Sequence, residues 1–240
     1  VEALLLANRP DGELPLKGLA VLVTAGPTQE PLDPVRFLTN HSTGKMGYAL
    51  AEQARDLGAQ VTLVSGPVAL DAPYGVDVVD VTTARDMFDA VTNRFADTDI
   101  TVMAAAVGDF RPVEQARDKI KKNGRSSIEL ELTSNPDILA WAGEHKRPDQ
   151  TLCGFAMETR DLETNAAKKL ASKHCDMLAA NNLRTPGAGF AADTNVVTVL
   201  TPGETADKPN IERWSKMGKD ALAKRILVKL AAMRADGERR

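Results

Sequence analysis

One short stretch before an expected helix, RFLTNHSTG, gathers groups that bind anions: Arg36, Asn40, Ser42 and Thr43, followed by Gly44. The free N–H groups and the dipole of a helix N-terminus favour negative charge as well. About 17 residues separate the preceding strand from this helix, whereas roughly 2 to 6 are usual and longer loops tend to be functional. The stretch therefore predicts an anion or nucleotide site. The alternative is that one of its hydroxyls only caps the helix, while Gly47 allows close packing on the strand.

No common phosphate motif accounts for this loop. A P-loop needs Gly, four residues and then Gly-Lys-Ser/Thr, but Met46 follows Gly44-Lys45, and Thr39 stands where the first Gly belongs. No G-x-G-x-x-G follows the first expected strand, and the second ends in Ser65-Gly66 instead of an acid. Neither tyrosine has a lysine four residues on. These absences weigh against a nicotinamide oxidoreductase, which remains an alternative beside a nucleotide-binding regulatory module without turnover.

A second cluster, MAAAVGDFRP (103–112), ends an apolar run in small residues followed by an acid. Met103 and the small residues Ala104 and Ala105 precede Asp109, so a flat base can approach the backbone while the carboxylate accepts from ribose hydroxyls. Tight packing of a helix on the strand, with a surface Asp109, explains the composition equally well.

Lysines supply the remaining candidates for phosphate binding. Lys119 and Lys121 share one face of the KIKK segment. Such a run is usually a solvated strand edge, but here it follows the candidate base site in the sequence. Lys169 and Lys173 lie four apart on one face of an expected helix, either as surface charges or as a phosphate clamp. Asn135 is expected to cap the helix that begins at Pro136.

Composition excludes several classes of protein. A net charge of −3 over 240 residues argues against a broad nucleic-acid surface, because counterion release needs a basic face. No stretch approaches the roughly 18 apolar residues of a membrane span, and no signal-peptide pattern is present. Cys153 and Cys175 lack metal-type spacing, and the histidines are scattered. We expect a cytoplasmic protein with reduced thiols, small-molecule partners, no nucleic acid and no membrane.

These residues need a scaffold, and the apolar runs alternate with helical patterns, as in a parallel sheet covered by helices. Strands are expected over 19–26, 60–66, 77–81, 99–107, 151–157, 176–182 and 195–200, and helices over 44–59, 84–96, 136–146, 161–174 and 215–233. DKIKK, the turn NGRS and SIELEL suggest a hairpin. The predicted fold is α/β: a doubly wound, Rossmann-like, mostly parallel sheet with an inserted β flap near 108–134.

The expected organisation is a linker over 1–18 and one nucleotide-binding domain over 19–240. Because the chain opens on Val1 instead of Met, it is expected to be a fragment of something longer. Ligands of such sheets bind at the carboxyl ends of the strands. The functional loops are therefore expected to follow Ala25, Val64, Val107, Met157 and Ala180.

Taken in order, these stretches resemble phosphopantothenate–cysteine ligase, the synthetase domain often fused to a flavin-dependent decarboxylase in bacterial coenzyme A biosynthesis. The resemblance is carried by AGPTQEPLDPVRFLTNHSTGKMG (25–47), AAAVGDFRP (104–112), KIKK (119–122), NPDIL (135–139), GFAMET (154–159) and AAKKLASKHCDMLAANN (166–182). These stretches span roughly residues 19 to 200 in the family's order. Gly108 stands where the family commonly has Ala, and Met157 where GFAAET is usual.

The resemblance implies a ligase that joins phosphopantothenate to cysteine with CTP and Mg²⁺, as a homodimer, through an acyl-cytidylate. The implied CTP site comprises Met103, Ala104, Ala105, Asp109, Lys119, Pro136, Asp137, Ile138, Leu139, Phe155, Lys169 and Lys173. Arg36 and Asn40 serve the acyl group and, with Lys119, are the implied catalytic residues. Ser42, Thr43 and Gly44 form the phosphate or acyl loop. Mg²⁺ is expected to bind through phosphates, with no direct protein ligand.

Overall fold

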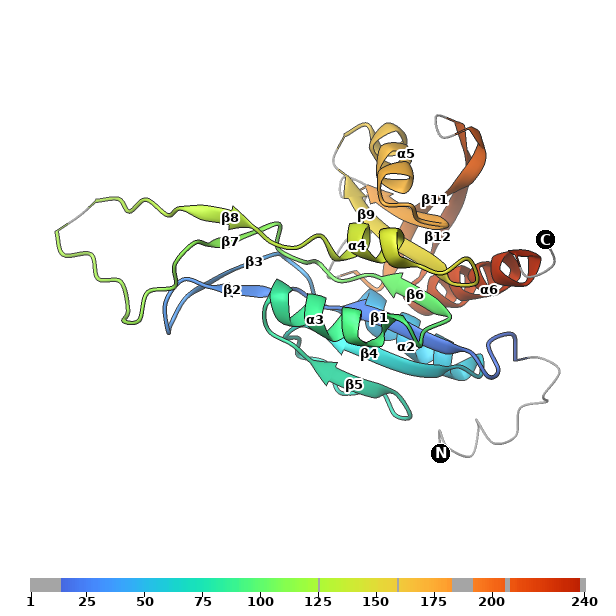
Figure 1. Cartoon of the computed structure of the whole chain (residues 1–240), viewed down its shortest axis with the longest axis horizontal. Coiled ribbons are helices and arrows are strands. Elements are labelled where there is room, and N and C mark those ends of the chain that lie inside the picture. Colours follow the sequence, from blue (N-terminus) through green and yellow to red (C-terminus); the bar gives the residue numbers. More distant parts are fainter. Residues whose placement is uncertain (1–13, 125, 159, 183–191, 206–207, 238–240) are drawn as a thin grey trace.

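The computed structural model describes residues 14–124, 126–158, 160–182, 192–205 and 208–237. Its centre is a sheet with six parallel strands: β1 (Ala20–Ala25), β4 (Gln60–Ser65), β5 (Asp77–Asp80), β6 (Ile100–Met103), β9 (Thr151–Glu158) and β10 (Met177–Asn182). They lie in the order β5-β4-β1-β6-β9-β10 (Figure 1). Numbered along the chain, this is the 3-2-1-4-5-6 order of doubly wound nucleotide-binding sheets. The α/β, Rossmann-like prediction is confirmed.

Helices cover both faces of this sheet because neighbouring residues on each strand point to opposite sides. On β1, Val21 and Val23 pack in a cluster with α2 (Lys45–Asp56) and α6 (Lys219–Gly237), whereas Leu22 packs with α3 (Ala84–Phe95). The cluster around Leu22 also includes α4 (Ile138–His145) and α5 (Leu162–Ser172). No helix in the described ranges is long and apolar enough to cross a membrane.

An antiparallel hairpin extends the sheet beyond β10. It consists of β11 (Thr194–Thr205) and β12 (Lys208–Gly218), and β11 pairs with β10. The expected helix over 215–233 was wrong at its start, because residues up to Gly218 belong to β12 and α6 begins at Lys219. The sequence did not predict β12, since Trp214 is its only buried residue and no apolar alternation marks it.

A long arm projects from one end of the body (Figure 1). Two short antiparallel pairs form its ribbon: β2 (Gln29–Pro31) with β3 (Phe37–Thr39), and β7 (Phe110–Pro112) with β8 (Leu132–Ser134). The expected strand over DKIKK is wrong, and SIELEL joins a strand only at Leu132. Both segments are largely exposed, so no buried face fixes a strand register there.

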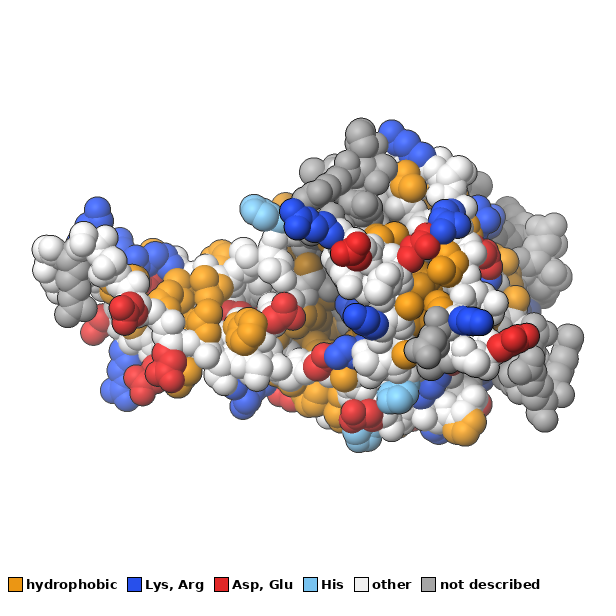
Figure 2. Space-filling view, turned by 90° about the horizontal axis from the view of Figure 1, so that it is seen from above, with side chains coloured by type: hydrophobic (Ala, Val, Ile, Leu, Met, Phe, Trp, Pro, Cys, Tyr) orange, Lys and Arg blue, Asp and Glu red, His pale blue; other side chains and the backbone are white. Residues whose placement is uncertain are grey.

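Exposed apolar side chains run along this arm (Figure 2). The large ones are Val35, Phe37, Phe110, Val113, Ile128, Leu130 and Leu132. Contiguous exposed apolar surface of this kind marks an interaction site more often than an ordinary solvated face.

The packed chain begins before residue 19. Leu16 is fully buried, and its N–H donates to the carbonyl oxygen of Leu57 at 3.0 Å. Residues near the end of the expected linker therefore pack against the C-terminal end of α2.

Candidate functional site

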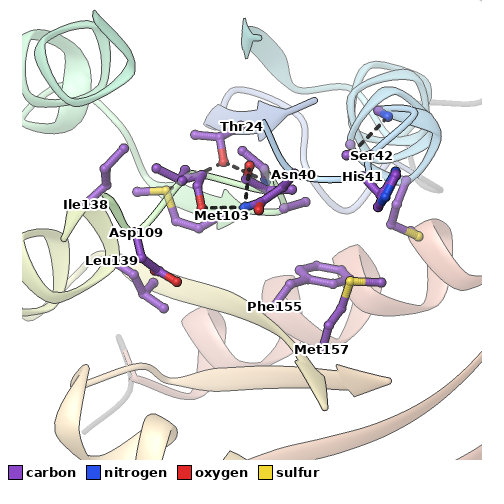
Figure 3. Close-up of a pocket in the computed structure, with 18 of the residues that line it drawn as sticks. Thr24, Asn40, His41, Ser42, Met103, Asp109, Ile138, Leu139, Phe155 and Met157 are labelled. Atoms are coloured by element: carbon purple, nitrogen blue, oxygen red, sulfur yellow. Dashed lines mark hydrogen bonds between the residues drawn. The ribbon is translucent and has the colours of Figure 1, made fainter. Parts of the chain in front are cut away.

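A cavity of about 950 Å³ opens along the carboxyl edge of the sheet. It lies where the strand order reverses between β1 and β6, which is where such sheets bind ligands. Asp109, Ile138 and Leu139 gather at one end, and His41 and Ser42 lie at the other, beside α2 (Figure 3). Phe155 and Met157 face Asn40 across the space between these ends (Figure 3). Segments following β1, β6, β9 and β10 contribute to the cavity, and the loop after Val64 does not.

Most residues singled out from the sequence line this cavity. They are Asn40, Ser42, Thr43, Gly44, Met103, Ala104, Ala105, Asp109, Pro136, Asp137, Ile138, Leu139, Phe155, Lys169 and Lys173. Arg36 and Lys119 do not line it and lie on the arm. The fold thus brings together groups that are widely separated in the sequence.

The N-terminus of α2 faces the cavity. Its N-cap is Gly44, at a left-handed φ of 76°, a residue without a side chain that could cap the helix. The hydroxyl of Ser42 accepts from the N–H of Gly44 at 3.3 Å, so Ser42 bonds to the N-cap residue and not to the first turn of the helix. The expected close packing at Gly47 is confirmed, because a Cβ there would lie 2.4 Å from the Cβ of Ala25. First-turn N–H groups at a helix N-terminus favour an anion.

Hydrogen bonds join the loops after β1 and β6. Thr24 accepts from the N–H of Ala104 at its carbonyl oxygen (3.2 Å) and from the N–H of Ala105 at Oγ1 (3.2 Å). Nδ2 of Asn40 donates to the carbonyl oxygen of Val107 at 2.9 Å. These bonds fix the small-residue segment after β6 against the end of β1 and against the long loop that follows it.

At the other end, α4 and α5 hold two lysines over the cavity. Lys169 Nζ donates to the carbonyl oxygen of Phe155 at 3.0 Å, and Lys173 Nζ lies 2.5 Å from Oδ2 of Asp137. Oδ1 of Asp137 caps α4 by accepting from the N–H of Ala140 at 2.9 Å. Burial opposes ionisation of Asp137, but the bonds from Lys173 and Ala140 outweigh it and lower its pKa.

The expected capping by Asn135 is wrong, since α4 begins at Ile138 with Asp137 as its N-cap. Asn135 instead donates from Nδ2 to the carbonyl oxygen of Gly108 at 2.8 Å, and its N–H donates to that of Asp109. Asn135 therefore links the segment before α4 to the segment after β6, at the point where the arm joins the body. A Cβ at Gly108 would make only ordinary contacts, the nearest at 3.5 Å, so Ala fits there.

Asp33 organises the part of the arm that carries Arg36 and Lys119. Its carboxylate, buried within the arm, accepts from the guanidinium of Arg36 and from the N–H of Ile120 at 3.0 Å. The guanidinium also donates to the carbonyl oxygen of Ile120 at 2.7 Å. Hydrogen bonding to Arg36 holds the pKa of Asp33 well below its ordinary value. The segment beside Lys119 is thereby tied to the turn before β3.

The cavity also contains residues that the sequence did not assign to the CTP site, to the catalytic set or to the phosphate loop, although His41 lies in the predicted anion-binding loop. Those most relevant to its chemistry are Thr24, His41, Asn135, Met157, Asn181, Asn195 and Lys219. The rule that sites follow strand ends pointed to the segment after Ala180, and hence to Asn181. Asn195 and Lys219 had no such signal, because they depend on the position of the β11–β12 hairpin.

Metal-ligand clusters and reactive thiols were sought among the described residues. These residues hold no group of three or more His, Cys, Asp or Glu side chains placed to bind a metal ion. Burial raises the pKa of Cys175 to about 12 and that of Cys153 well above its ordinary value. Buried thiols of this kind are poor nucleophiles.

Residues 16–233 match the family described as DNA/pantothenate metabolism flavoprotein C-terminal domain. The coenzyme A biosynthesis bifunctional protein CoaBC of Bacillus subtilis (strain 168) is 51% identical over 187 residues, covering 78% of this chain and 46% of that protein. The chain thus spans about half the length of the curated relatives it matches.

Solved structures give the same fold. The C-terminal domain of a coenzyme A biosynthesis bifunctional protein CoaBC matches with a TM-score of 0.77 at 38% identity, covering 93% of this chain and 99% of that one. A Cab2 mutant in complex with phosphopantothenate-cysteine matches with a TM-score of 0.71 at 18% identity, covering 91% and 87%.

Proposed function

The chain belongs to the DNA/pantothenate metabolism flavoprotein C-terminal domain family, and on this premise we propose that it ligates phosphopantothenate to cysteine with CTP, in coenzyme A biosynthesis. Its relatives at 43–51% identity include several coenzyme A biosynthesis bifunctional proteins. The Cab2 mutant described above has the same fold, and the phosphopantothenate-cysteine in its complex is the product that this reaction would form. The implied location is the cytoplasm.

One observation supports this proposal more strongly than the others do. The residues assigned through the family resemblance, apart from Arg36 and Lys119, converge on a single cavity at the switch point of the sheet. A cavity of about 950 Å³ is within the usual range for nucleotide-sized ligands. Convergence of this kind supports a common ligand site more strongly than any one motif does.

In the proposed complex, cytosine lies on Met103, Ala104 and Ala105. The N–H groups of the two alanines are already engaged by Thr24, so the base contact uses carbonyl oxygens, which accept from the exocyclic amine of cytosine. Asp109 accepts from the ribose hydroxyls. Contacts of backbone carbonyls with an amine favour CTP over a nucleotide that presents an acceptor at that position.

The first chemical step requires charge neutralisation, because a carboxylate and a triphosphate repel each other. A carboxylate oxygen of phosphopantothenate bonds to the α-phosphorus of CTP, and the bond to the bridging oxygen breaks as pyrophosphate leaves. Lys169 and Lys173, held by Phe155 and Asp137, are placed to exchange these oxygens for phosphate oxygens. A lysine contact that strengthens in the transition state raises the rate.

In the second step, the cysteine amine attacks the acyl carbon and loses a proton, and CMP departs with the electron pair of the broken bond. Asn40 orients the acyl group without adding a charge that would trap the intermediate. This scheme needs no nucleophilic side chain, in keeping with the raised pKa values of both cysteines.

Mg²⁺ is the proposed cofactor; carried into the cavity with the triphosphate, it would neutralise part of the phosphate charge. Among the described residues lining the cavity, Asp109 and Asp137 are the carboxylates, and Asp137 is paired with Lys173. This donor set fits a cation carried mainly by the triphosphate, since Mg²⁺ typically binds one or two carboxylates together with substrate phosphates.

A homodimer is part of the proposal. Arg36 and Lys119 lie on the arm, outside the cavity of their own chain, and the arm exposes a row of apolar side chains. Packing of this arm against a second copy would bury those side chains and bring both cations to the partner's cavity. This arrangement reconciles the roles implied for Arg36 and Lys119 with their positions.

The test combines the protein with CTP, Mg²⁺, phosphopantothenate and cysteine, and measures pyrophosphate and phosphopantothenoylcysteine. Both products are expected, and omission of CTP or its replacement by UTP, which presents an acceptor in place of the exocyclic amine, should reduce their formation. No pyrophosphate above background would contradict the ligase proposal.

A further inference from the structure

The backbone around Asp109 is held from two sides at the root of the arm. The N–H of Gly108 donates to Oγ1 of Thr28 at 2.9 Å, and the carbonyl oxygen of Gly108 accepts from Nδ2 of Asn135 at 2.8 Å. The N–H of Asn135 also donates to the carbonyl oxygen of Asp109 at 2.8 Å. Three hydrogen bonds therefore fix the backbone immediately before and after the Cα of Asp109.

The two residues that hold this backbone are themselves anchored. Thr28 is fully buried just before β2, and its carbonyl oxygen accepts from Oγ1 of Thr39 at 2.8 Å. Asn135 follows β8, and its Oδ1 accepts from Nη1 of Arg111 at 3.1 Å. Because Oδ1 faces Arg111, the amide nitrogen of Asn135 is directed at Gly108. Both side chains are thus bound at more than one point and have one defined orientation.

The Asp109 carboxylate depends on this backbone for its position. It is exposed at the end of the cavity that Ile138 and Leu139 also line (Figure 3). Within the described ranges, no side chain forms a hydrogen bond or ion pair with this carboxylate. Aspartate is short, so a shift of its Cα moves the carboxylate by a similar distance. Hydrogen bonds weaken steeply with poor distance or angle, so a small displacement is enough to lose a ligand contact.

The chemistry of the two side chains suits a position beside a triphosphate. A hydroxyl and a carboxamide hold the Gly108 backbone without adding charge near the nucleotide. Thr28 is not among the residues that line the cavity. An effect of Thr28 on the choice of nucleotide must therefore pass through the Gly108 segment and Asp109.

We propose that Thr28 and Asn135 are positioning residues that set the preference of the ligase for a nucleotide with ribose hydroxyls. They hold the backbone of Gly108 and Asp109 so that the Asp109 carboxylate reaches both hydroxyls. The inference rests on the proposed function, in which Asp109 accepts from the ribose. It assigns to the root of the arm a role in nucleotide selection.

The test compares CTP with 2′,3′-dideoxy-CTP, which lacks both hydroxyls, by measuring kcat and KM for pyrophosphate release. The unsubstituted protein should prefer CTP by roughly ten- to a hundredfold in kcat/KM, the range for losing hydrogen bonds to a charged group. Thr28→Val removes the acceptor at closely similar shape. It should reduce this preference about fivefold or more, through lower kcat/KM with CTP alone.

Two further variants separate the hydroxyl from the rest of the side chain. Thr28→Ser keeps the acceptor for Gly108 and should retain the preference for CTP. Thr92→Val is the matched control, because it deletes a hydroxyl that donates to the carbonyl oxygen of Asp89 on α3. It should leave the kinetics with both nucleotides unchanged.

A double-mutant cycle separates positioning from a merely structural role. With the carboxylate removed by Asp109→Ala, addition of Thr28→Val should cause no further loss of kcat/KM with CTP. A structural role predicts the same further loss in both backgrounds. Asn135→Ala releases the same backbone from the other side and is measured in parallel, with melting temperatures, so that the comparison does not depend on the folding of one variant.

Several outcomes would overturn this inference and leave the ligase proposal standing. They are an unchanged preference in both Thr28→Val and Asn135→Ala, an equal loss with both nucleotides, additive losses in the Asp109→Ala background, and equal use of both nucleotides by the unsubstituted protein. No pyrophosphate release from CTP by the unsubstituted protein would overturn both.

Discussion

Nδ2 of Asn40 lies 2.9 Å from the carbonyl oxygen of Val107 and donates a hydrogen bond to it. This bond joins the long loop before α2 to the small-residue segment after β6, at the middle of the cavity. The carboxamide is neutral, so it holds the two loops together without adding charge beside the reacting groups. The first prediction follows from this neutrality.

Asn40→Asp should still release pyrophosphate but lose amide formation by on the order of a hundredfold, comparable to removal of one donor at a reacting centre. The new carboxylate cannot donate to Val107 and carries a negative charge at the acyl group. Pyrophosphate and phosphopantothenoylcysteine are measured in the same reaction. Equal loss of the two products would contradict the role proposed for Asn40.

Lys119→Gln should impair the first half-reaction, because the variant removes a cation proposed to meet the triphosphate. Mixing this variant with Asn40→Asp should restore part of the activity if the arm of one copy serves the cavity of the other. Each variant is assayed alone and after subunit exchange. A mixture no more active than its separate components rules out an arm acting across the dimer, and normal pyrophosphate release by Lys119→Gln rejects its role.

Asp33 should make the stability of the arm and its attached loops depend on pH in the acidic range. Its folded-state pKa is lowered by Arg36, so its contribution is present above the unfolded pKa of about 3.9 and is lost as pH falls toward the lowered value. The melting temperature of Asp33→Asn should therefore lie below that of the unsubstituted protein by a constant amount above pH ~5.

That gap should narrow below pH ~4, because Asp33 takes up a proton in the unfolded chain there while the folded carboxylate, with its lowered pKa, remains ionised. Asp89→Asn, at an exposed position on α3, is the control and should show little gap at any pH. If the difference in melting temperature between Asp33→Asn and the unsubstituted protein instead widened on acidification, the stabilising role assigned to the Asp33 carboxylate would be contradicted.

Gly47→Ala should destabilise the fold, because the added Cβ would lie 2.4 Å from the Cβ of Ala25 and 2.9 Å from its Cα. Overpacking of this kind typically costs about 1–3 kcal/mol, which is measured by denaturant unfolding. Gly108→Ala is the matched comparison, since its nearest contacts lie at an ordinary 3.5 Å. Equal stability of the two variants would mean that α2 can move away from β1 at little cost.

The central fold was predictable because burial imposes a regular pattern. Val21, Leu22 and Val23 form a continuous apolar run, as expected for a strand covered on both faces, and Leu50 recurs at helical spacing on α2. The start of α2 was predictable for the same reason. The position of Gly44 as the N-cap residue was not, since the local sequence also allowed Ser42 or Thr43 to act as the cap.

The structures of the arm and of the β11–β12 edge of the sheet could not be predicted, because they depend on contacts between residues that are distant in the sequence. Asp33 joins Ile120 across a separation of 87 residues, and no periodicity predicts that pairing. Trp214 alone is buried on β12, so the strand that positions Lys219 left no apolar alternation. For the same reason, the positions of Asn195 and Lys219 in the cavity wall were found only in the structure.

The most direct test of the central claim follows oxygen from substrate to product. Phosphopantothenate labelled with heavy oxygen in its carboxylate is incubated with CTP, Mg²⁺, cysteine and the protein, and the CMP is examined by mass spectrometry. Attack of the carboxylate on the α-phosphate predicts one labelled oxygen in each CMP, with one retained in the amide carbonyl of phosphopantothenoylcysteine. Unlabelled CMP formed together with that product would contradict activation through an acyl-cytidylate.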